Sequence, residues 1–569
     1  GTHNTCVGSQ AGVAQDGEGF NTWVGYYAGG TMNSGATHCV GLGAQALAAS
    51  TATGTAIGSI GIGFQSQNAL TSGAGNIAIG YGAMKENTTG QANIAIGYAA
   101  MDGSGGTNPA DSDHNIFIGY SSGGGDWSAG ADAKNEFNVA IGNSTMSAAL
   151  AGANYNTCLG YNSLSAVTEA DYSVAVGKDA LLSITTGAQN TSVGALSGDA
   201  LVGGDANVFM GVGAGGSTTA VSNTTILGYA AGNAVMTSAA DGTVAVGYTA
   251  LQSLTSGQGN TAVGFEALKT NIDGDKNTAV GYQALETFEA DADGHGENVA
   301  IGYNAMQAAT TATNTVAIGA GAMENGTLTG DSNVGVGYRA GYNLTSGTQN
   351  MMMGIDAAKL LTTGSYNVAI GVGALSVSTD VDKVIAIGAY ASESNMTSDS
   401  DGTVIIGYQS GQAIVSGRYN TAVGYQSLLT NIDGDGNTAV GYQALKTFEA
   451  ASDGQGNNTC IGYTAGDAIT NGLENTIIGS KAGAHAVDLT TGDYNTIIGT
   501  AADVSTADAQ NQTAIGHDCS AVANNSVTLG NASVDLVYCA QDGAAVVSAG
   551  GMGIGKGTTA PDKALEIYD

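Results

Sequence analysis

The sequence predicts an all-β protein, a parallel β-solenoid or β-roll of about 30 coils with a usual period of 17 residues. Three observations indicate it: a glycine-centred motif recurs almost end to end, residue types alternate around that glycine, and no helical periodicity is sustained. The 569 residues include 92 glycines and only 2 prolines, and 11% are charged. This composition fits neither a disordered chain nor a collagen.

The motif reads Asn-Thr-Ala-Val-Gly-Tyr-Gln-Ala-Leu at both 277–285 and 437–445. Its central glycine, called here the anchor glycine, recurs with a commonest spacing of 17 residues, and longer coils gain Gly, Asp, Asn, Ser and Thr. Such insertions are typical of loops that bulge from one edge of a solenoid. The residues that define the repeat include the aliphatic and glycine pairs Val263 and Gly264, Val280 and Gly281, Ile301 and Gly302, Val423 and Gly424, and Val440 and Gly441, with Asn277 and Asn437 at the start of their units.

A longer period lies on top of the first. The anchor glycines from 177 to 319 reappear 160 residues later, which indicates that a block of coils was duplicated, about 177–336 and 337–496. Duplication in whole coils lengthens a rod without changing its cross-section. We therefore predict one repeat shaft over residues 1–531, followed by a non-repeat β segment over 532–569.

The residues before the glycine predict the faces of a strand. An aliphatic residue such as Ile478 stands directly before the glycine and a β-branched residue stands three before it, with His38 a departure when Gly41 is taken as the anchor. Side chains alternate along a strand, so these two positions share one face, which we predict to be the coil interior. The other face carries a small residue, usually alanine, and an asparagine, and we predict that it packs against other chains. Seventeen residues leave room for two short strands and two turns per coil.

Asparagine four places before the glycine carries a further prediction. Stacked amides can hydrogen-bond from coil to coil along a rung spacing of about 4.8 Å. We expect Asn260, Asn277 and Asn298 to form such a ladder.

Units such as Asn367-Val368-Ala369-Ile370-Gly371 and Asn298-Val299-Ala300-Ile301-Gly302 resemble the head repeats of YadA-like trimeric autotransporter adhesins. The resemblance covers roughly residues 4–531 and implies a left-handed parallel β-roll assembled as a parallel homotrimer. The segment 525–530, followed by Gly553-Ile554-Gly555 and residues 559–567, looks like the end of phage tail-fibre shafts. The sequence shows neither a coiled-coil stalk nor a membrane barrel, so the phage reading is favoured.

These resemblances predict an extracellular location, on a virion tail fibre or a cell surface. The expected partners are two further copies of the chain, a host surface glycan or protein bound through a tip or loops, and a virion baseplate or cell-surface anchor. A net charge of −34 opposes binding to nucleic acid, and no run of 18 apolar residues predicts membrane insertion. The first residues lack an initiator methionine and fall inside a repeat unit, so we expect the natural N-terminus to lie upstream.

No catalytic residue and no cofactor site is predicted. The six histidines lack metal-ligand spacing, and the glycine cluster 211–215 lacks the strand-to-helix context of a dinucleotide site. The acidic turns carry oxygen ligands that calcium could use, although aspartate and glycine are also ordinary turn residues. The calcium candidates are Asp273, Asp275, Asp433 and Asp435, beside a similar turn at 291–294.

Tyrosine follows the anchor glycine in about half of the coils. Such a row could bind glycans, or it could simply pack with its hydroxyls towards solvent or another chain. The surface row includes Tyr282, Tyr303, Tyr425 and Tyr442.

Cysteine replaces a small residue in the repeat and is predicted to stay a free, buried thiol. Cys6, Cys39, Cys158 and Cys460 are placed two before an anchor glycine, Cys519 is three after one, and Cys539 lies outside the register.

These features favour the shaft of a trimeric fibre used in host attachment, most of all a phage tail fibre. The alternative is a bacterial trimeric surface adhesin or extracellular filament. A polysaccharide-degrading spike would need a groove with paired carboxylates, which a narrow coil does not predict. Ice binding is weakened because threonine interchanges freely with valine and isoleucine.

Overall fold

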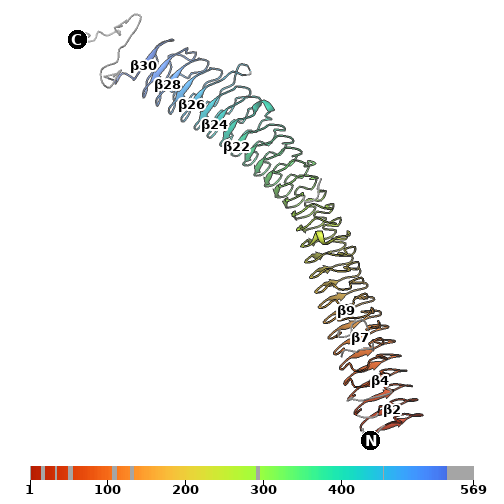
Figure 1. The fold of residues 1–569 in the computed structure, drawn as a ribbon. Helices are drawn as coiled ribbons and strands as arrows, with labels where there is room; N and C mark the ends of the chain where they lie inside the picture. Colours follow the sequence, from red (N-terminus) through yellow and green to blue (C-terminus); the bar gives the residue numbers. More distant parts are fainter. Residues whose placement is uncertain are drawn as a thin grey trace, which may run out of the picture.

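The computed structural model describes residues 2–14, 19–32, 35–48, 56–104, 112–127, 134–289, 295–452 and 454–534. These residues form one long curved rod with the two chain ends at opposite tips, and its coils follow one another in chain order (Figure 1). The predicted parallel β-solenoid with a usual period of 17 residues is confirmed. Of the predicted C-terminal segment, residues 535–569 lie outside the described part.

One strand of three residues stands directly before each anchor glycine, and neighbouring strands pair in parallel and in register. For example, Thr261 pairs with Thr278, and Val263 with Val280. The second strand expected in each coil is not formed in the described residues, where turns complete the coil. The strands are β1 (Thr5–Val7), β2 (Thr22–Val24), β3 (Val40–Leu42), β4 (Ile60–Ile62), β5 (Ile77–Ile79), β6 (Ile94–Ile96), β7 (Ile116–Ile118), β8 (Val139–Ile141), β9 (Thr157–Leu159), β10 (Val174–Val176), β11 (Thr191–Val193), β12 (Val208–Met210), β13 (Thr225–Leu227), β14 (Val244–Val246), β15 (Thr261–Val263), β16 (Thr278–Val280), β17 (Val299–Ile301), β18 (Val316–Ile318), β19 (Val334–Val336), β20 (Met351–Met353), β21 (Val368–Ile370), β22 (Ile385–Ile387), β23 (Val404–Ile406), β24 (Thr421–Val423), β25 (Thr438–Val440), β26 (Thr459–Ile461), β27 (Thr476–Ile478), β28 (Thr496–Ile498), β29 (Thr513–Ile515) and β30 (Val527–Leu529).

Two short 3-10 turns interrupt this pattern, η1 (Ser238–Ala240) and η2 (Ser398–Ser400). They lie at positions 160 residues apart, the same offset that separates the repeated anchor glycines. Each follows a coil loop and precedes the next strand, β14 or β23.

The two faces of the strand are opposite to the prediction. The middle residue of each strand is buried inside the coil everywhere except in β1 and β30, whereas its first and third residues are half-buried or exposed. In β27, Ile477 is fully buried and Ile478 lies on the outside. The reason is space: a Cβ added to Gly41 in β3 would lie only 2.7 Å from the Trp23 ring. The interior of the coil is too thin for large residues in every strand, so alanine usually lines it.

A second position shares this narrow interior, the residue four after the anchor glycine. In most coils it is a buried Leu or Met such as Leu268. Where the middle strand residue is large, glycine often stands there instead, as with Gly29 beneath Trp23 and Gly215 beside Phe209. A Cβ on Gly29 would lie 2.5 Å from the indole ring of Trp23. The Leu-or-Gly choice therefore keeps the filled volume of a coil nearly constant.

The anchor glycine itself is required by stacking. Gly264 has a φ of +148°, and a Cβ there would lie 2.0 Å from the carbonyl oxygen of Gly281 in the next coil. No other residue avoids both the disfavoured backbone region and this contact with the neighbouring main chain. The recurrence of glycine thus follows from the close approach of successive coils.

The register of the third coil also corrects the sequence analysis. Val40 pairs with Thr22, so the anchor of this coil is Gly43 rather than Gly41. Consequently His38 stands five before the anchor with a φ of +63°, and Cys39 occupies the asparagine position. The backbone N–H of Cys39 donates to Oδ1 of Asn21 at 2.9 Å, as an asparagine there would. Both glycines follow an aliphatic residue, so residue types alone do not fix this register.

The predicted asparagine ladder is confirmed. Oδ1 of Asn260 accepts hydrogen bonds from the backbone N–H of Asn277 at 2.9 Å and from its Nδ2 at 3.2 Å. Oδ1 of Asn277 accepts the same pair from Asn298, each at 3.1 Å, and Nδ2 of Asn298 also donates to the carbonyl of Ala312. Each buried amide is therefore satisfied by neighbouring coils and the facing loop, and any register slip would leave it unpaired.

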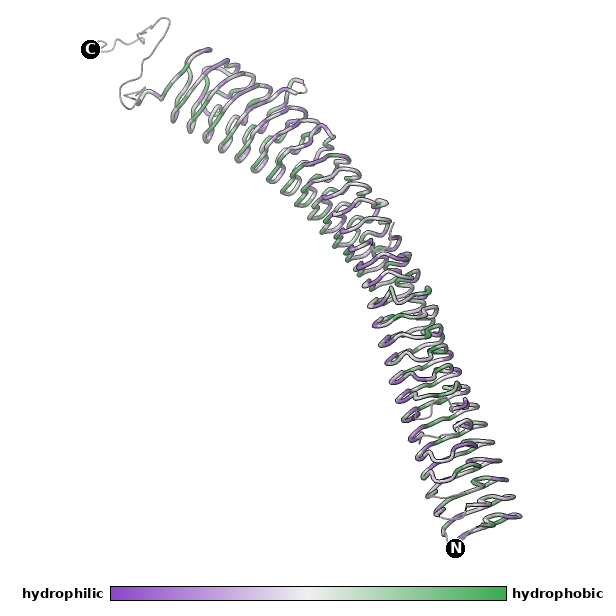
Figure 2. Tube along the Cα trace, in the orientation of Figure 1, coloured by the Kyte–Doolittle hydropathy of each residue, from purple (hydrophilic) through white to green (hydrophobic). Residues whose placement is uncertain are grey.

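Hydrophobic and hydrophilic residues alternate within every coil along the whole rod (Figure 2). One long core cluster of small and aliphatic side chains runs from Ala78 to Ala509, and a shorter one includes Trp23 and Leu70. The core is therefore linear, and each coil is stabilised mainly by the coils next to it.

Candidate functional site

Stacked aromatic rows lie on the outside of the rod. Tyr282 and Tyr303 have ring centroids 5.2 Å apart and planes within 10°, and Tyr425 and Tyr442 are 5.1 Å apart and within 7°. The structure therefore brings the predicted tyrosines together in pairs within longer rows. The rows in this position are Phe64, Tyr81, Tyr98 and Tyr120; Tyr229, Tyr248, Phe265, Tyr282 and Tyr303; and Tyr408, Tyr425, Tyr442 and Tyr463.

The stacking limits what these rows can bind. Inside a row both faces of each ring are covered by neighbouring rings, so only ring edges and hydroxyls reach solvent. At the end of its row Tyr303 is 57% exposed, compared with 41% for Tyr282 inside it. Sugars and cations bind aromatic side chains through the ring face. Such binding is therefore restricted to row ends, and packing accounts for the rings inside the rows.

A second aromatic row, which the sequence analysis missed, stands five residues before the anchor glycine. His3, Phe20 and His38 stack at 4.8 and 5.0 Å, and His114 begins another stack that ends at Tyr172. The described members of this row have a positive φ, for example +63° at His38 and +54° at Tyr172. The signal was present in the sequence as aromatic residues at a fixed distance before the anchor glycine.

The outer strand face, defined here as the first and third residues of the strands, is the largest apolar surface. It consists of threonine, valine and isoleucine over almost the whole rod. Ile301 and Ile318 are 37% and 38% exposed, and Leu159 is 49% exposed. The rise of about 4.8 Å over 29 steps and a width of about 10 Å give roughly 1,400 Å² of sheet. Monomeric proteins seldom expose contiguous apolar patches above about 600 Å².

The predicted calcium candidates fall into two kinds. Oδ1 of Asp275 accepts the backbone N–H of Gln258 at 2.8 Å, and Oδ1 of Asp435 accepts that of Arg418 at 2.7 Å. These two carboxylates therefore link one coil to the one before it. The other two candidates, Asp273 and Asp433, each keep an Oδ1 without a hydrogen bond in the described structure.

Asp273 and Asp433 each lie near a glutamate. Burial raises the pKa of Glu289, with a smaller contribution from the charge of Asp273, and the same holds for Glu449 beside Asp433. In the described residues no group of three or more His, Cys, Asp or Glu side chains is placed to hold a metal ion. The turn at 291–294 lies outside the described part. Calcium binding at these turns stays a prediction.

The aspartate links extend well beyond the candidates. An aspartate six residues before the anchor glycine recurs in many coils and accepts a backbone N–H of the preceding coil. Sequence reasoning missed this row, although its fixed spacing from the glycine was visible. The members besides Asp275 and Asp435 are Asp113, Asp171, Asp205, Asp241, Asp331, Asp382, Asp401 and Asp493.

The five described cysteines are free, and four of them are buried. Cys6 is the exception: it is exposed in β1, contrary to the expectation of a buried thiol. Burial raises the pKa of the Cys158 thiol to about 12 and raises those of Cys39 and Cys460 as well. A raised pKa keeps the thiol protonated, and the thiolate is the reactive form.

We expect this difference to appear in thiol titration without reductant. In a chain with Cys539→Ser, which removes the cysteine outside the described residues, Cys6 should react at once in the native state. The other four thiols should react only after denaturation. A native protein with two or more fast thiols, or a denatured protein that gains none, would contradict the placement of these side chains.

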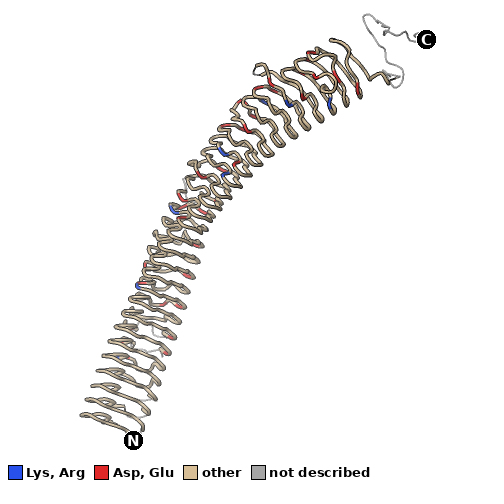
Figure 3. Tube along the Cα trace, turned by 180° about the vertical axis from the view of Figure 1, so that it is seen from behind, with Lys and Arg blue, Asp and Glu red and all other residues tan. Residues whose placement is uncertain are grey.

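Charge is distributed unevenly along the rod. Residues 1–100 contain only Asp16, Glu18, Lys85 and Glu86 as charged side chains, and most of the net charge of −34 lies in later coils (Figure 3). Electrostatic self-repulsion between rods is therefore strongest over the later coils. Among the described residues, no helix has the length and apolar character needed to span a bilayer.

Comparison with known proteins adds no assignment to this geometry. Neither a family model nor a curated protein sequence matches the chain.

Proposed function

We propose that this chain is the shaft of a trimeric extracellular fibre used in host attachment, most of all a phage tail fibre. The observation that carries the proposal is the unbroken outer strand face, an apolar surface that runs the length of a rod with a linear core. Chains that leave such a face uncovered associate or aggregate. A continuous stripe is best covered by a parallel copy of the same rod, since every coil then meets an equivalent coil.

The role is structural rather than catalytic in this proposal. Stacked coils transmit length and stiffness, and added coils change neither cross-section nor neighbour contacts. The three-fold assembly follows the resemblance of the repeats to trimeric adhesin heads, with the contact moved from the alanine face to the valine and isoleucine face. The two further partners are a baseplate or cell-surface anchor and a host surface molecule.

Light scattering of the intact chain in solution tests the assembly. The expected mass is three times 55.8 kDa, independent of concentration over a wide dilution range. A stable species of 55.8 kDa would overturn the proposal, and a dimer would retain the covered face but reject the three-fold arrangement.

A further inference from the structure

Two adjoining hollows lie on the part of the coil that follows the anchor glycine, not on the outer strand face. The first has a volume of about 300 Å³ and extends from Asp356 to Glu393. The second, of about 470 Å³, shares Glu393 and continues to Leu429 and Thr430. Together they cross the coils anchored at 354, 371, 388, 407 and 424, so they form one groove that runs along the rod. Sites that bind small organic ligands have similar volumes.

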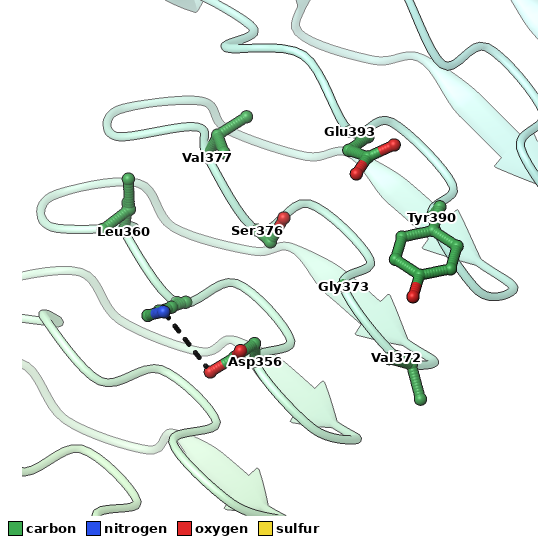
Figure 4. A pocket seen from close by; sticks show the side chains of 9 residues that line it. Asp356, Leu360, Val372, Gly373, Ser376, Val377, Tyr390 and Glu393 are labelled. Carbon is green, nitrogen blue, oxygen red and sulfur yellow. Dashed lines mark ion pairs between the residues drawn. The ribbon is translucent and has the colours of Figure 1, made fainter.

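The first hollow exists because one side chain is missing. Gly373 stands two after its anchor glycine, where the neighbouring coils carry Asp356 and Tyr390. Its φ is +64°, and a Cβ there would lie 3.0 Å from Cδ1 of Tyr390. Figure 4 shows Tyr390, Ser376 and Glu393 around this gap, with Leu360 and Val377 at the outer turns.

The lining combines polar groups with an aliphatic rim. Asp356 pairs with Lys359 at 3.6 Å, yet its Oδ1 makes no hydrogen bond in the described structure (Figure 4). Oε2 of Glu393 accepts Nε2 of Gln412, which fixes that carboxylate at the point where the two hollows meet. The groove therefore offers two carboxylates, an amide and a serine hydroxyl beside apolar side chains, the partners that hydroxyl groups and C–H faces need.

Tyr390 differs from the stacked rows. Its ring is perpendicular to that of Tyr408, at 90° and 6.1 Å, whereas Tyr408 and Tyr425 are parallel within 10°. Tyr408 therefore meets Tyr390 at an edge contact and does not stack on it as row members stack on one another. A ring free of such a stacked neighbour, at the wall of a hollow, can receive an apolar ligand face.

We propose that this groove binds a neutral oligosaccharide extended along the rod, with one sugar unit per coil. A rise of about 4.8 Å per coil is close to the length of one sugar unit in an extended β-linked chain, whereas an extended peptide advances about 3.3 Å per residue. Two carboxylates against one lysine, on a chain of net charge −34, disfavour an anionic polysaccharide. The inference holds whether or not the chain is a fibre shaft.

The 160-residue offset supplies an internal comparison. The residues equivalent to Asp356, Tyr390 and Glu393 are Leu196, Ala230 and Asn233. The equivalent coils therefore share the anchor spacing but lack the carboxylates and the ring. Matched substitutions in the two places separate a local effect on binding from a general effect on the solenoid.

Saturation-transfer NMR and calorimetry on the full chain test the proposal. The probes are cellohexaose, maltohexaose and chitohexaose as neutral oligosaccharides, hexagalacturonate as an acidic one, and hexalysine as an extended peptide. At least one neutral hexasaccharide should bind, and Tyr390→Asn and Glu393→Gln should each weaken it about tenfold or more. Asparagine tolerates the positive φ at position 390, and glutamine keeps the shape at 393.

The equivalent changes Ala230→Asn and Asn233→Gln should leave that affinity unchanged, and melting curves should confirm that all four variants fold. Binding of none of the neutral hexasaccharides, or of hexalysine or hexagalacturonate alone, would overturn the proposal. So would neutral-sugar binding that Tyr390→Asn and Glu393→Gln leave as tight as before.

Discussion

Replacing Ile477 by aspartate should unfold the coil around β27, whereas the same change at the adjacent Ile478 should leave the coil folded. Ile477 is fully buried in the thin interior, so an aspartate there would be an unpaired buried charge. Such a charge costs roughly 3–5 kcal/mol. Ile478 lies on the outer strand face, where in a single rod the carboxylate remains in contact with water.

The two variants should therefore fail in different ways. Hydrogen exchange and limited proteolysis should show local opening near residues 460–500 for Ile477→Asp alone. Ile478→Asp should instead weaken the proposed assembly and shift the mass measured by light scattering towards 55.8 kDa. Equal local opening in both variants, or opening with Ile478→Asp only, would show that the faces are assigned wrongly.

Removing one copy of the duplicated block should shorten the fibre and leave it able to assemble. Deleting Lys178 to Gly337 joins Gly177 to Tyr338, a junction equivalent to one already present, and removes nine strands, β11 to β19. At about 4.8 Å per coil the rod should lose about 43 Å in electron micrographs. Stability should stay close to that of the intact rod per coil, since solenoid stability is approximately a sum over neighbouring repeats.

A second deletion of equal length serves as the matched partner. Deleting Tyr248 to Gly407 also removes nine strands, β15 to β23, but takes Asp356, Tyr390 and Glu393 with it. Both rods should be equally short, and adsorption through a tip should survive in both. A well-assembled short rod that has lost all adsorption in both forms would place the host contact in the deleted shaft.

The repeat was readable from sequence because each coil must bring main chains into close contact at the same point. Only glycine fits where the backbone of Gly264 meets that of Gly281, so the period is written directly in glycines. The asparagine ladder was readable for a similar reason, since a buried amide needs its neighbour at the same height. Both signals depend on local stacking, which a single sequence records.

The orientation of the strand could not be predicted in the same way. Hydrophobicity favoured Ile478 for the interior over an alanine, but the width of the coil decides the matter, and width depends on the facing residues. The pairing of Leu268 with a strand alanine, and of Gly29 with Trp23, shows that two positions fill one narrow layer. The alternation of Leu and Gly four after the anchor was visible in the sequence and becomes informative only with that layer in view.

The groove was not predictable because no motif marks it. It arises where Gly373 leaves a gap between Asp356 and Tyr390, three residues from three successive coils. Their spacing in the sequence equals the coil period, so they resemble every other trio at that position until their side chains are compared. The tyrosine rows predicted as a glycan surface have covered ring faces, and the ring at the groove stands one position later in its coil.

Cryo-electron microscopy of the assembled rod, averaged in cross-section, tests the central claim most directly. We predict three chains around one axis, with the valines and isoleucines of the outer strand face turned inward and the alanine layer enclosed within each chain. The rod should extend about 140 Å from β1 to β30 at about 4.8 Å per coil. Single rods with the outer strand face open to solvent, or an assembly that leaves this face on its surface, would contradict the account.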